Sequence, residues 1–484
     1  MKRQLHYHNP LLTDLYQITM AAGYFEAGKA EQESVFHLFF RSLPFNGGYA
    51  ISAGLEDAVR WLEHFSFDDE VLSYLSSLKG NQGEPLFTPE FLEYLKGLRW
   101  SCDVDAMAEG TLVFPHQPIL RVKGQLLQAQ WVETALLNII NFQTLIATRA
   151  ARIVGAASGD PVLEFGLRRA QGPDGGLMAS RAAYIGGCAA TSNVLAGHEF
   201  GIPVKGTHAH SWVMSFDDEL SAFREYAEAM PDNCVLLVDT FDTLAGVEHA
   251  IEIGRELRQR GHQLAGIRLD SGDLAWLSKE SRKRLDEAGF EDTAIVASND
   301  LDEETIESLR NQGAKITVWG VGTRMVTGGE QSALGGVYKL GALRDEKAGW
   351  IPKMKLSEER VKVSQPGILQ VRRFREGDQL IGDAIYDEER GCPAHPTLID
   401  PSEPLRRKVI AEAAQGEDLL VPLYRKGELV AELPSLDVVR DHAAAQLTLL
   451  DSTIRRIDRP HRYPAGLESG LYNRKQELLD ALET

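Results

Sequence analysis

Two histidines separated by one residue are candidates for chemistry. His208 and His210 follow a short apolar run and precede an aromatic segment, so the sequence predicts a strand end, a turn and a helix start. An imidazole there can transfer protons, bind a metal or accept a phosphoryl group near neutral pH. We expect His210 to be catalytic; a structural role is the alternative. A metal site is disfavoured, because no later predicted strand end carries a histidine.

Two small-residue turns are suited to phosphate. Gly320, Gly322 and Thr323 close an apolar run, where glycines let backbone N–H groups approach an anion and threonine adds a hydroxyl. Ser271 and Gly272 form a second turn of this type. The sequence therefore predicts anion binding at both turns.

Charged side chains accompany these turns. Arg268 ends an apolar run just before the second turn, and we expect it to bind a substrate. Asp270 and Asp273 can hold a ribose diol or a Mg²⁺-bound pyrophosphate, although Asp273 also suits a helix N-cap. Arg168 and its neighbour Arg169 follow another run, where guanidinium groups suit carboxylate or phosphate.

The elements that must position these residues repeat between about residues 160 and 340. Short β-branched runs alternate with segments of helical periodicity at intervals of about 20 to 40 residues, which is typical of βα units. Thr243–Arg260 shows the helical pattern well. The predicted strands are Val162–Phe165, Val204–Gly206, Val235–Val238, Leu264–Ile267, Ala294–Ala297 and Ile316–Trp319.

Polar residues follow every one of these predicted strands. An open parallel sheet concentrates its chemistry at one switch point, whereas a barrel collects it from all its strand ends. We therefore predict an α/β fold with an irregular TIM-like (β/α) barrel. The strand-end residues are Glu164, Phe165, Arg168, Thr207, His210, Asp239, Thr240, Arg268, Asp270, Asn299, Asp300, Gly320, Gly322 and Thr323.

The chain ends do not share this repeat. We expect residues 1–115 to form the N-terminal part of a second α/β domain, 116–345 the barrel, and 346–484 a segment that returns to the second domain. The stretch Gly80–Pro85 reads as a surface loop. Short alternating strands at Ile368–Val371 and Leu419–Leu423 precede a charged helical tail.

Composition limits the possible partners. The formal charge of −19 over 484 residues argues against nucleic acid or an anionic membrane, which both require a basic surface. Four distant cysteines without a C-x-x-C pair are typical of reduced thiols. There is no run of about 18 apolar residues and no signal-peptide core. We therefore expect a soluble cytoplasmic protein.

Taken together, these segments resemble the nicotinate phosphoribosyltransferases over nearly the whole chain. The resemblance implies a type II phosphoribosyltransferase barrel, with a second α/β sandwich-type domain built from both chain ends. It also implies a homodimer whose sites lie near the subunit interface. The segments that carry it are Asn9–Tyr16, Glu164–Gly176, the surroundings of His210, Ile267–Asp273, Ser298–Asp300 and Gly320–Thr323.

The resemblance also assigns roles to single residues. Tyr16 matches an aromatic that stacks on the pyridine ring in the partner subunit's site, and Phe165 covers the other face. Arg268 and Thr207 match nicotinate-binding positions. His210 matches the histidine that ATP phosphorylates. Thr323 matches a position for 5-phosphoribosyl 1-diphosphate, which we extend to Arg168, Ser271, Gly272, Gly320 and Gly322.

The implied reaction joins nicotinate to 5-phosphoribosyl 1-diphosphate and releases pyrophosphate, coupled to hydrolysis of ATP with Mg²⁺. His210, Arg268 and Asp270 are the expected catalytic residues. Nicotinamide-specific relatives carry an aspartate for the substrate amide, and the matching stretch Thr191–Asn193 has no acid. The alternatives are nicotinamide or quinolinate transfer, or a non-catalytic pyridine- or phosphate-binding barrel.

Overall fold

A computed structural model describes residues 9–355 and 363–483. The chain divides into two compact units. We call Met1–Leu145 with Ala333–Thr484 the terminal unit, and Ile146–Ser332 the central unit. The first boundary falls inside the helix α6 (Glu133–Ala157).

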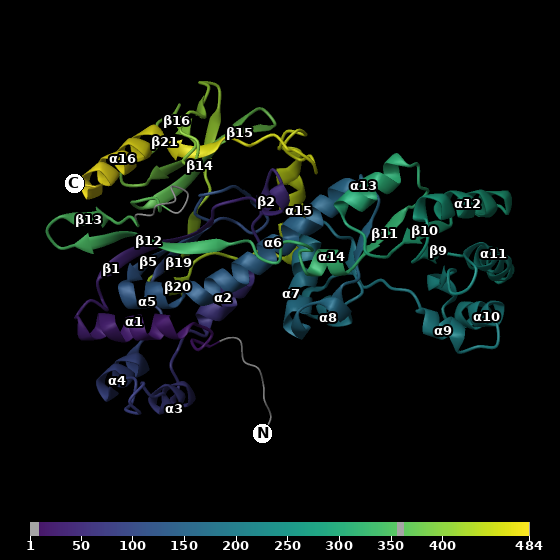
Figure 1. The fold of residues 1–484 in the computed structure, drawn as a ribbon, viewed down its shortest axis with the longest axis horizontal. Helices are drawn as coiled ribbons and strands as arrows, with labels where there is room; N and C mark the ends of the chain where they lie inside the picture. The colour runs from purple at the N-terminus through teal and green to yellow at the C-terminus, as the bar shows by residue number, and fades with distance from the viewer. Residues whose placement is uncertain (1–8, 356–362, 484) are drawn as a thin grey trace. The chain divides into compact units, whose positions relative to one another are not determined.

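The central unit is built on a parallel sheet with the strand order β7-β6-β11-β10-β9-β8 (Figure 1). The mixed α/β architecture with a parallel sheet and two domains, predicted from the sequence, is therefore confirmed. The strands are β6 (Val162–Glu164), β7 (Ala190–Thr191), β8 (Val235–Leu237), β9 (Gly266–Leu269), β10 (Ala294–Ala297) and β11 (Val318–Val321).

The strand order is cyclic except at one seam. The strand β6, first along the chain, pairs with β11, the last. On its other side β7 continues only through an isolated bridge from Thr191 to Val204. Within the described residues no ladder joins the Val204 segment to β8, so the expected strand Val204–Gly206 is reduced to this bridge. A closed barrel is therefore not established, because a segment with one neighbour cannot build ladders on both sides.

The helices of the central unit connect its strands in sequence. The helices α10, α11 and α12 lie side by side, as Figure 1 shows. They are α7 (Gly172–Ile185), α8 (Val194–Phe200), α9 (His210–Met214), α10 (Glu219–Ala229), α11 (Thr243–Gln259), α12 (Leu274–Glu287), α13 (Glu303–Asn311) and α14 (Thr323–Val326), with the 3₁₀ turns η2 (Leu167–Arg169) and η3 (Pro231–Asn233).

The helix α11 illustrates how local sequence sets these elements. Asp242 caps its start, because the carboxylate accepts a hydrogen bond from the Ala245 N–H at 2.8 Å. The apolar stripe is buried, and Gly261 with φ +86° ends the helix in the left-handed conformation that glycine tolerates. Gly246 is required for packing, since a Cβ there would lie 2.2 Å from the Val238 carbonyl oxygen.

Two strands begin later than their apolar runs predict. The run at Leu264–Ile267 becomes β9 from Gly266, and the run at Ile316–Trp319 becomes β11 from Val318. Thr317 shows the reason, because its hydroxyl accepts a hydrogen bond from the Ile295 N–H at 3.0 Å. A side chain there takes the backbone partner that a ladder would use.

The terminal unit contains two larger sheets. Their strand orders are β13-β12-β1-β5-β3-β19-β20 and β17-β16-β21-β15-β14-β18, and β2 pairs with β4. The strands are β1 (Glu33–Phe40), β2 (Ala50–Ile51), β3 (Asp103–Ala106), β4 (Leu112–Val113), β5 (Leu120–Gln125), β12 (Gly336–Asp345), β13 (Gly349–Pro352), β14 (Leu369–Glu376), β15 (Gln379–Asp387), β16 (Thr397–Ile399), β17 (Arg407–Val409), β18 (Gln415–Asp418), β19 (Val421–Arg425), β20 (Glu428–Leu429) and β21 (Ala465–Glu468).

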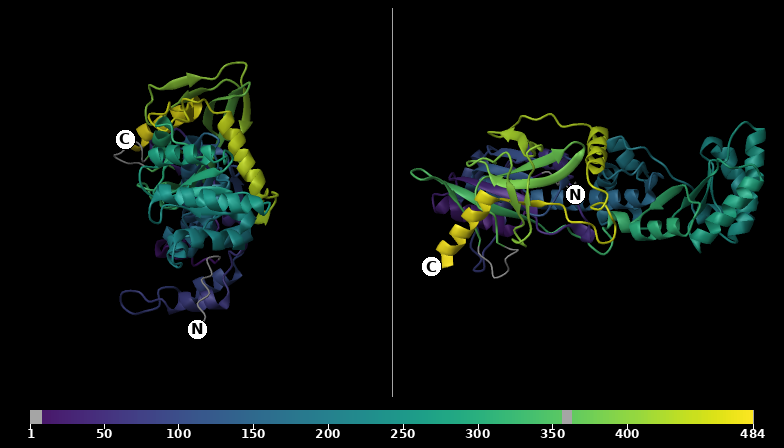
Figure 2. Two further views of the ribbon diagram at one scale, coloured as in Figure 1. Left: turned by 90° about the vertical axis from the view of Figure 1, so that its right-hand side faces the viewer. Right: turned by 90° about the horizontal axis from the view of Figure 1, so that it is seen from above.

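Helices cover these sheets and enclose an aromatic core. The last helix packs on β15, β16 and β21, and Figure 2 shows it as the yellow helix at the C-terminus. Trp61, Phe65, Phe67 and Trp131 pack edge to face or tilted in the core. The helices are α1 (Leu15–Glu26), α2 (Leu55–Glu63), α3 (Asp69–Ser77), α4 (Pro89–Gly97), α5 (Leu126–Trp131), α15 (Leu436–Thr448) and α16 (Ser469–Glu483), with the 3₁₀ turn η1 (Pro44–Asn46).

None of the four cysteines, all of which lie in the described ranges, forms a disulfide. Cys102, Cys188 and Cys234 are buried and Cys392 is half-buried. Burial raises the pKa of Cys234 to about 12 and that of Cys392 to about 11, so both stay protonated at neutral pH. Among the residues described, no helix combines the length and apolar character that spanning a bilayer requires.

Candidate active site

Arg268, at the end of β9, is the centre of a polar cluster in the central unit. Its Nε donates to Ser298 Oγ at 2.8 Å, Nη1 to Thr207 Oγ1 at 2.9 Å and Nη2 to Asp270 Oδ1 at 3.0 Å. Three of the five guanidinium N–H groups are thus used, and one on each terminal nitrogen remains. The side chain is 15% exposed. The arginine is therefore held in place and still has donors for a carboxylate.

Phe165 supplies an aromatic surface next to this guanidinium. It directly follows β6, its N–H donates to the Val321 carbonyl at 2.8 Å, and its ring centre lies 5.8 Å from Arg268 Cζ. Gly320 makes this position possible, because a Cβ there would lie 2.8 Å from two ring carbons. Gly320 therefore has a packing reason that the sequence pattern did not indicate. An aromatic ring beside an arginine suits a planar aromatic acid.

His210 lies beside two carboxylates and a hydroxyl. It is the first residue of α9, and its Nδ1 lies 3.1 Å from Thr240 Oγ1. Its Nε2 lies 3.8 Å from Asp270 Oδ2 and 4.0 Å from Asp239 Oδ1. The imidazole is 40% exposed, so a ligand can reach it. The Nε2 edge of the ring thus faces the two carboxylates, and the Nδ1 edge faces the Thr240 hydroxyl.

Asp239 was not assigned a role from the sequence. Its Oδ2 accepts hydrogen bonds from the Asp270 N–H at 2.9 Å and from the Ser271 hydroxyl at 2.7 Å. Its Oδ1 is buried and has no hydrogen-bond partner among the described residues. A buried carboxylate oxygen without a partner is costly, which marks it as a position for a ligand or cation. The signal was its place two residues beyond the end of β8, near a strand end like Asp270, which immediately follows β9.

His208 has a different environment from His210. Its Nε2 accepts a hydrogen bond from the Leu237 N–H at 3.2 Å, and its Nδ1 lies 3.3 Å from the Ala209 carbonyl. These contacts require a neutral ring with the proton on Nδ1. Burial lowers the pKa of His208, with a smaller contribution from the Arg268 charge, so the neutral form is favoured. His208 therefore links β8 to the segment across the seam and acts structurally.

The turn after β9 combines an N-cap with the cluster. Asp273 caps α12, since its Oδ1 accepts a hydrogen bond from the Trp276 N–H at 3.0 Å. Ser271 instead contacts Asp239, and Gly272 has φ +81°. The backbone of this turn is exposed, as an anion-binding turn must be.

A second group of donors lies near the end of β11. Thr323 begins α14, and its hydroxyl accepts a hydrogen bond from Arg169 Nη1 at 3.1 Å. Arg168 lies on η2, is exposed, and its side chain has no hydrogen-bond or ion-pair partner within the described ranges. Gly322 lies against Phe165, because a Cβ there would be 3.1 Å from the Phe165 carbonyl oxygen. Guanidinium groups, a hydroxyl and a helix start are donor types suited to phosphate.

The loop after β10 is strained. Asn299 has φ +100° and Asp300 has φ +43°, a conformation that non-glycine residues adopt at a cost of about 1–3 kcal/mol each. Asp300 pairs with Arg324 at 3.2 Å on the far side of the loop. The strain presents the Ser298–Asp300 backbone beside the cluster, and such strain concentrates at functional sites.

The buried acid Glu164 lies behind Phe165. Its Oε2 accepts hydrogen bonds from the hydroxyls of Thr191 at 2.6 Å and Ser180 at 2.8 Å, and its Oε1 accepts from the Gly166 N–H. The Ser192 N–H donates to the Glu164 carbonyl at 2.9 Å. The stretch Thr191–Asn193 thus lies next to an acid, but both oxygens of that acid are occupied.

Tyr16 belongs to the terminal unit, unlike the other predicted site residues. It lies on α1, is 49% exposed, and its hydroxyl contacts Glu133 Oε1 at 3.4 Å. Burial raises the pKa of Tyr16, and Glu133 raises it further, so the phenol stays neutral. Its ring is accessible for stacking.

A cluster of cations in the terminal unit was also missed from the sequence. Burial lowers the pKa of Lys339; the Glu133 carboxylate opposes this shift, and the charges of Arg41 and Lys355 add to it. Their separation along the chain left no local pattern by which to find them. Over the described ranges, no group of three His, Cys, Asp or Glu side chains is arranged to hold a metal ion.

Comparisons with known proteins agree along the chain. Three descriptions match it: the nicotinate phosphoribosyltransferase (NAPRTase) N-terminal domain over residues 11–141, the NAPRTase family over 162–346, and the nicotinate phosphoribosyltransferase C-terminal domain over 370–475. The nicotinate phosphoribosyltransferase of Bacillus subtilis is 45% identical over 482 residues, covering 98% of this chain and 96% of the relative.

Solved structures support the same grouping. The crystal structure of human nicotinic acid phosphoribosyltransferase aligns with a TM-score of 0.83 at 34% identity, covering 96% of this chain and 99% of the other. The nicotinate-nucleotide pyrophosphorylase of Pyrococcus furiosus shares the fold, with a TM-score of 0.69 at 24% identity over 93% of this chain and 99% of the other.

Proposed function

We propose a residue-level mechanism for this chain, which belongs to the nicotinate phosphoribosyltransferase family. The chain is an enzyme that transfers a phosphoribosyl group to nicotinate. The observation that carries the mechanism is the pair of unused N–H groups on Arg268 beside the Phe165 ring.

Nicotinate binds with its carboxylate on Arg268 and its ring on Phe165. Thr207 orients the guanidinium, because its hydroxyl accepts a hydrogen bond from Arg268 Nη1 at 2.9 Å and donates one to the His208 carbonyl at 3.1 Å. Both oxygens of the buried Glu164 already accept hydrogen bonds from hydroxyl and backbone donors, so this acid does not serve the amide of nicotinamide. Selection of the acid follows from Arg268, whose two remaining N–H groups pair with a carboxylate and find no such charge on an amide.

The diphosphate substrate occupies the donors nearer α12 and α14. Thr323, Arg168 and the Gly320–Gly322 backbone hold phosphate groups, and Ser271 with Gly272 holds others. Asp270 accepts from a ribose hydroxyl. The family's fold and the polar strand ends favour a barrel, open at the Val204 seam, whose mouth holds both substrates.

The transfer step requires positioning rather than a base. The pyridine nitrogen of nicotinate carries no proton at neutral pH, so its lone pair attacks ribose C1 directly while the C1–O bond to pyrophosphate breaks. The enzyme contributes alignment of the two reactants and donors for the negative charge on the leaving group.

ATP acts through His210. A lone pair of its imidazole attacks the γ-phosphorus, ADP leaves, and the phosphoryl group adds about two negative charges at the site. Asp270 and Asp239 stabilise the positive charge that the ring then carries. Hydrolysis of the phosphohistidine after transfer resets the site, because a permanent charge would repel pyrophosphate.

Asp239 and Asp270 are suited to Mg²⁺, since carboxylate oxygens are its preferred protein ligands and the Asp239 Oδ1, 4.0 Å from His210 Nε2, has no hydrogen-bond partner among the described residues. These residues would hold the ion with the substrate phosphates, and the ion would supply neutralising charge.

The proposed assembly is a cytoplasmic homodimer. Tyr16, exposed on α1, stacks on the pyridine ring in the partner subunit's site. Mixing inactive Tyr16→Ala and Arg268→Ala proteins should then restore activity, because one of the two sites in each heterodimer is intact. Absence of rescue after verified subunit exchange would place Tyr16 in its own site or in none.

The mechanism is tested with three substrates side by side. Pyrophosphate release should require nicotinate, should be poor with nicotinamide or quinolinate, and should rise with ATP. Incubation with γ-labelled ATP should give an acid-labile, base-stable phosphate that is lost in His210→Ala and kept in His208→Ala. The reverse pattern would identify His208 as the acceptor. Lack of label in the wild type would exclude the ATP step.

A further inference from the structure

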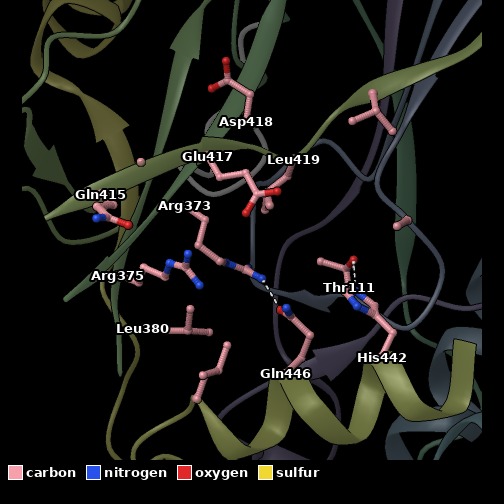
Figure 3. A pocket seen from close by; sticks show the side chains of 14 residues that line it. Thr111, Arg373, Arg375, Leu380, Gln415, Glu417, Asp418, Leu419, His442 and Gln446 are labelled. Carbon is pink, nitrogen blue, oxygen red and sulfur yellow. Dashed lines mark hydrogen bonds between the residues drawn. The ribbon is translucent and has the colours of Figure 1, made fainter. Parts of the chain in front are cut away.

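The terminal unit contains a cavity that the proposed reaction does not use. It has a volume of about 250 Å³ and lies between strands β14 and β18 on one side and helix α15 on the other (Figure 3). An interface between a sheet and a helix is ordinarily apolar. This one is lined by two arginines, a glutamate, two glutamines and a histidine: Arg373, Arg375, Glu417, Gln415, Gln446 and His442.

These side chains share the cavity because of strand register and helix period. Arg373 pairs with Glu417 and Arg375 with Gln415 across the two strands, which places all four on one face of the sheet. On α15, His442 and Gln446 are four residues apart, so both lie on the helix face that is directed toward the cavity. The polar lining of the cavity therefore follows from the register of the two strands and the period of the helix.

One of the two arginines is already satisfied. Arg373 donates to both oxygens of Asp383, to the Leu112 carbonyl at 2.7 Å and to Gln446 Oε1 at 3.0 Å. It forms a fixed wall of the cavity. His442 contributes a neutral group, because burial lowers its pKa and the Arg373 charge lowers it further. Its Nε2 lies 3.2 Å from Thr111 Oγ1.

Arg375 and Glu417 are not satisfied in this way. Neither side chain forms a hydrogen bond or ion pair with any residue in the described parts of the chain, although both line the same cavity. Figure 3 shows the Arg375 guanidinium and the Glu417 carboxylate directed into this space from adjacent strands. Both side chains are exposed to solvent, so a free positive and a free negative group face the open part of this cavity without contacting each other, and Leu380 and Leu449 line its apolar part.

We propose that this cavity binds a zwitterion of amino-acid size, with its carboxylate on Arg375 and its ammonium group on Glu417. A simple anion is disfavoured because Glu417 repels it, and the chain's net charge of −19 adds to that repulsion. A simple cation is disfavoured by Arg375. A ligand carrying both charges satisfies both groups, and its side chain packs on Leu380 and Leu449.

The test is calorimetric titration of the full-length enzyme with each standard amino acid. At least one should bind. Arg375→Gln and Glu417→Gln should each weaken binding about tenfold or more, as expected for loss of a charge-assisted hydrogen bond. Arg459→Gln, at a 94% exposed arginine, removes the same charge elsewhere and should leave binding unchanged. Arg268→Ala should also leave it unchanged, which separates this cavity from the active site.

Several results would overturn the proposal. Absence of binding by every amino acid would show that Arg375 and Glu417 are merely solvated. Equal binding of butyrate or inorganic phosphate would identify a plain anion site, and equal binding of butylamine a plain cation site. Unchanged affinity in both variants would place the ligand elsewhere. Circular dichroism of each variant excludes misfolding, and Arg375→Lys, which keeps the charge, should retain part of the affinity.

Discussion

Two arginine–aspartate pairs, one in each unit, use the same chemistry differently. In the terminal unit Arg373 donates to Asp383 at 2.7 and 3.0 Å, and the side chains are 6% and 0% exposed. Tyr463 and Gln117 also donate to Asp383, each at 2.7 Å. Four of the five guanidinium N–H groups of Arg373 and both oxygens of Asp383 have partners inside the unit, so the pair has little capacity left for a ligand.

The pair in the central unit is incomplete by comparison. Arg268 donates to Asp270 at 3.0 Å, but the side chains are 15% and 28% exposed, and two guanidinium N–H groups remain available. The acceptors around it are hydroxyls and one carboxylate at separate strand ends. A saturated pair stabilises its unit, whereas an unsaturated and fixed pair is prepared for a substrate.

Breaking the saturated pair should have the largest effect. Asp383→Asn leaves Arg373 buried without a counter-charge, which we expect to lower the free energy of unfolding by about 3–5 kcal/mol. Hydrogen exchange should increase in β14 and β15 and remain unchanged in β9. Asp458→Asn, at an 88% exposed aspartate, is the matched control. A loss below about 1 kcal/mol would contradict the structural role of the pair.

Breaking the unsaturated pair should affect binding more than folding. Arg268→Ala should weaken nicotinate binding by at least ~2 kcal/mol, the scale for a charge-assisted hydrogen bond. Its effect on unfolding should be smaller than that of Asp383→Asn. Calorimetry with nicotinate measures the first and urea unfolding the second. If Arg268→Ala left the affinity for nicotinate unchanged and Arg168→Ala lowered it, Arg168 would be the residue that binds the nicotinate carboxylate.

The closed interior of the terminal unit should also respond to acid. Burial lowers the pKa of His37 to about 3, and the Arg121 charge contributes. Between pH 6.5 and 3 the unfolded chain binds a proton that the folded chain does not, so stability falls as pH falls. The expected slope is about 1.4 kcal/mol per pH unit from this group. Urea unfolding between pH 7 and pH 5 measures this slope. The free energy of unfolding of His37→Gln should depend less on pH than that of the wild type, and an equal slope would contradict the role of His37.

The smallest change should come from loosening Arg268 without removing it. Ser298 accepts from Arg268 Nε at 2.8 Å and donates to Asp270, so it positions both. Ser298→Ala should raise KM for nicotinate by a factor corresponding to about 1 kcal/mol and change kcat little. Ser308→Ala, at an exposed position on α13, should change neither. A fall in kcat of the same size, with KM unchanged, would instead mean that Ser298 acts in the transition state.

Much of the parallel sheet follows from the local pattern. The runs Val162–Phe165 and Ala294–Ala297 became β6 and β10 almost unchanged, and Thr243–Arg260 became α11 to within one residue. Such elements are determined by the spacing of apolar residues and by capping residues at their ends. Both signals lie within a few positions of each other in the sequence. The run at Val204 failed because a ladder requires a partner on another strand, and no property of the run itself supplies one.

The sequence also placed the reactive residues at strand ends, where the structure brings Thr207, His210, Arg268 and Asp270 together. Their roles in catalysis stay predictions. The order of polar residues after successive strands was sufficient for this grouping, since parallel strands end at the same edge. It could not distinguish Arg168 from Arg169, which differ only in which side chain reaches Thr323.

What the sequence by itself determined is the family, the succession of strands and helices, and the residue types available at each strand end. Only the tertiary structure decided which groups keep unused hydrogen-bonding or ion-pairing capacity. These are the two N–H groups of Arg268, the Oδ1 of Asp239, and the unpaired charges of Arg375 and Glu417. Periodicity depends on residues a few positions apart. Saturation of a polar group also depends on distant partners, such as Thr207 and Ser298 for Arg268, which are 61 and 30 residues away and which only packing brings within hydrogen-bond distance.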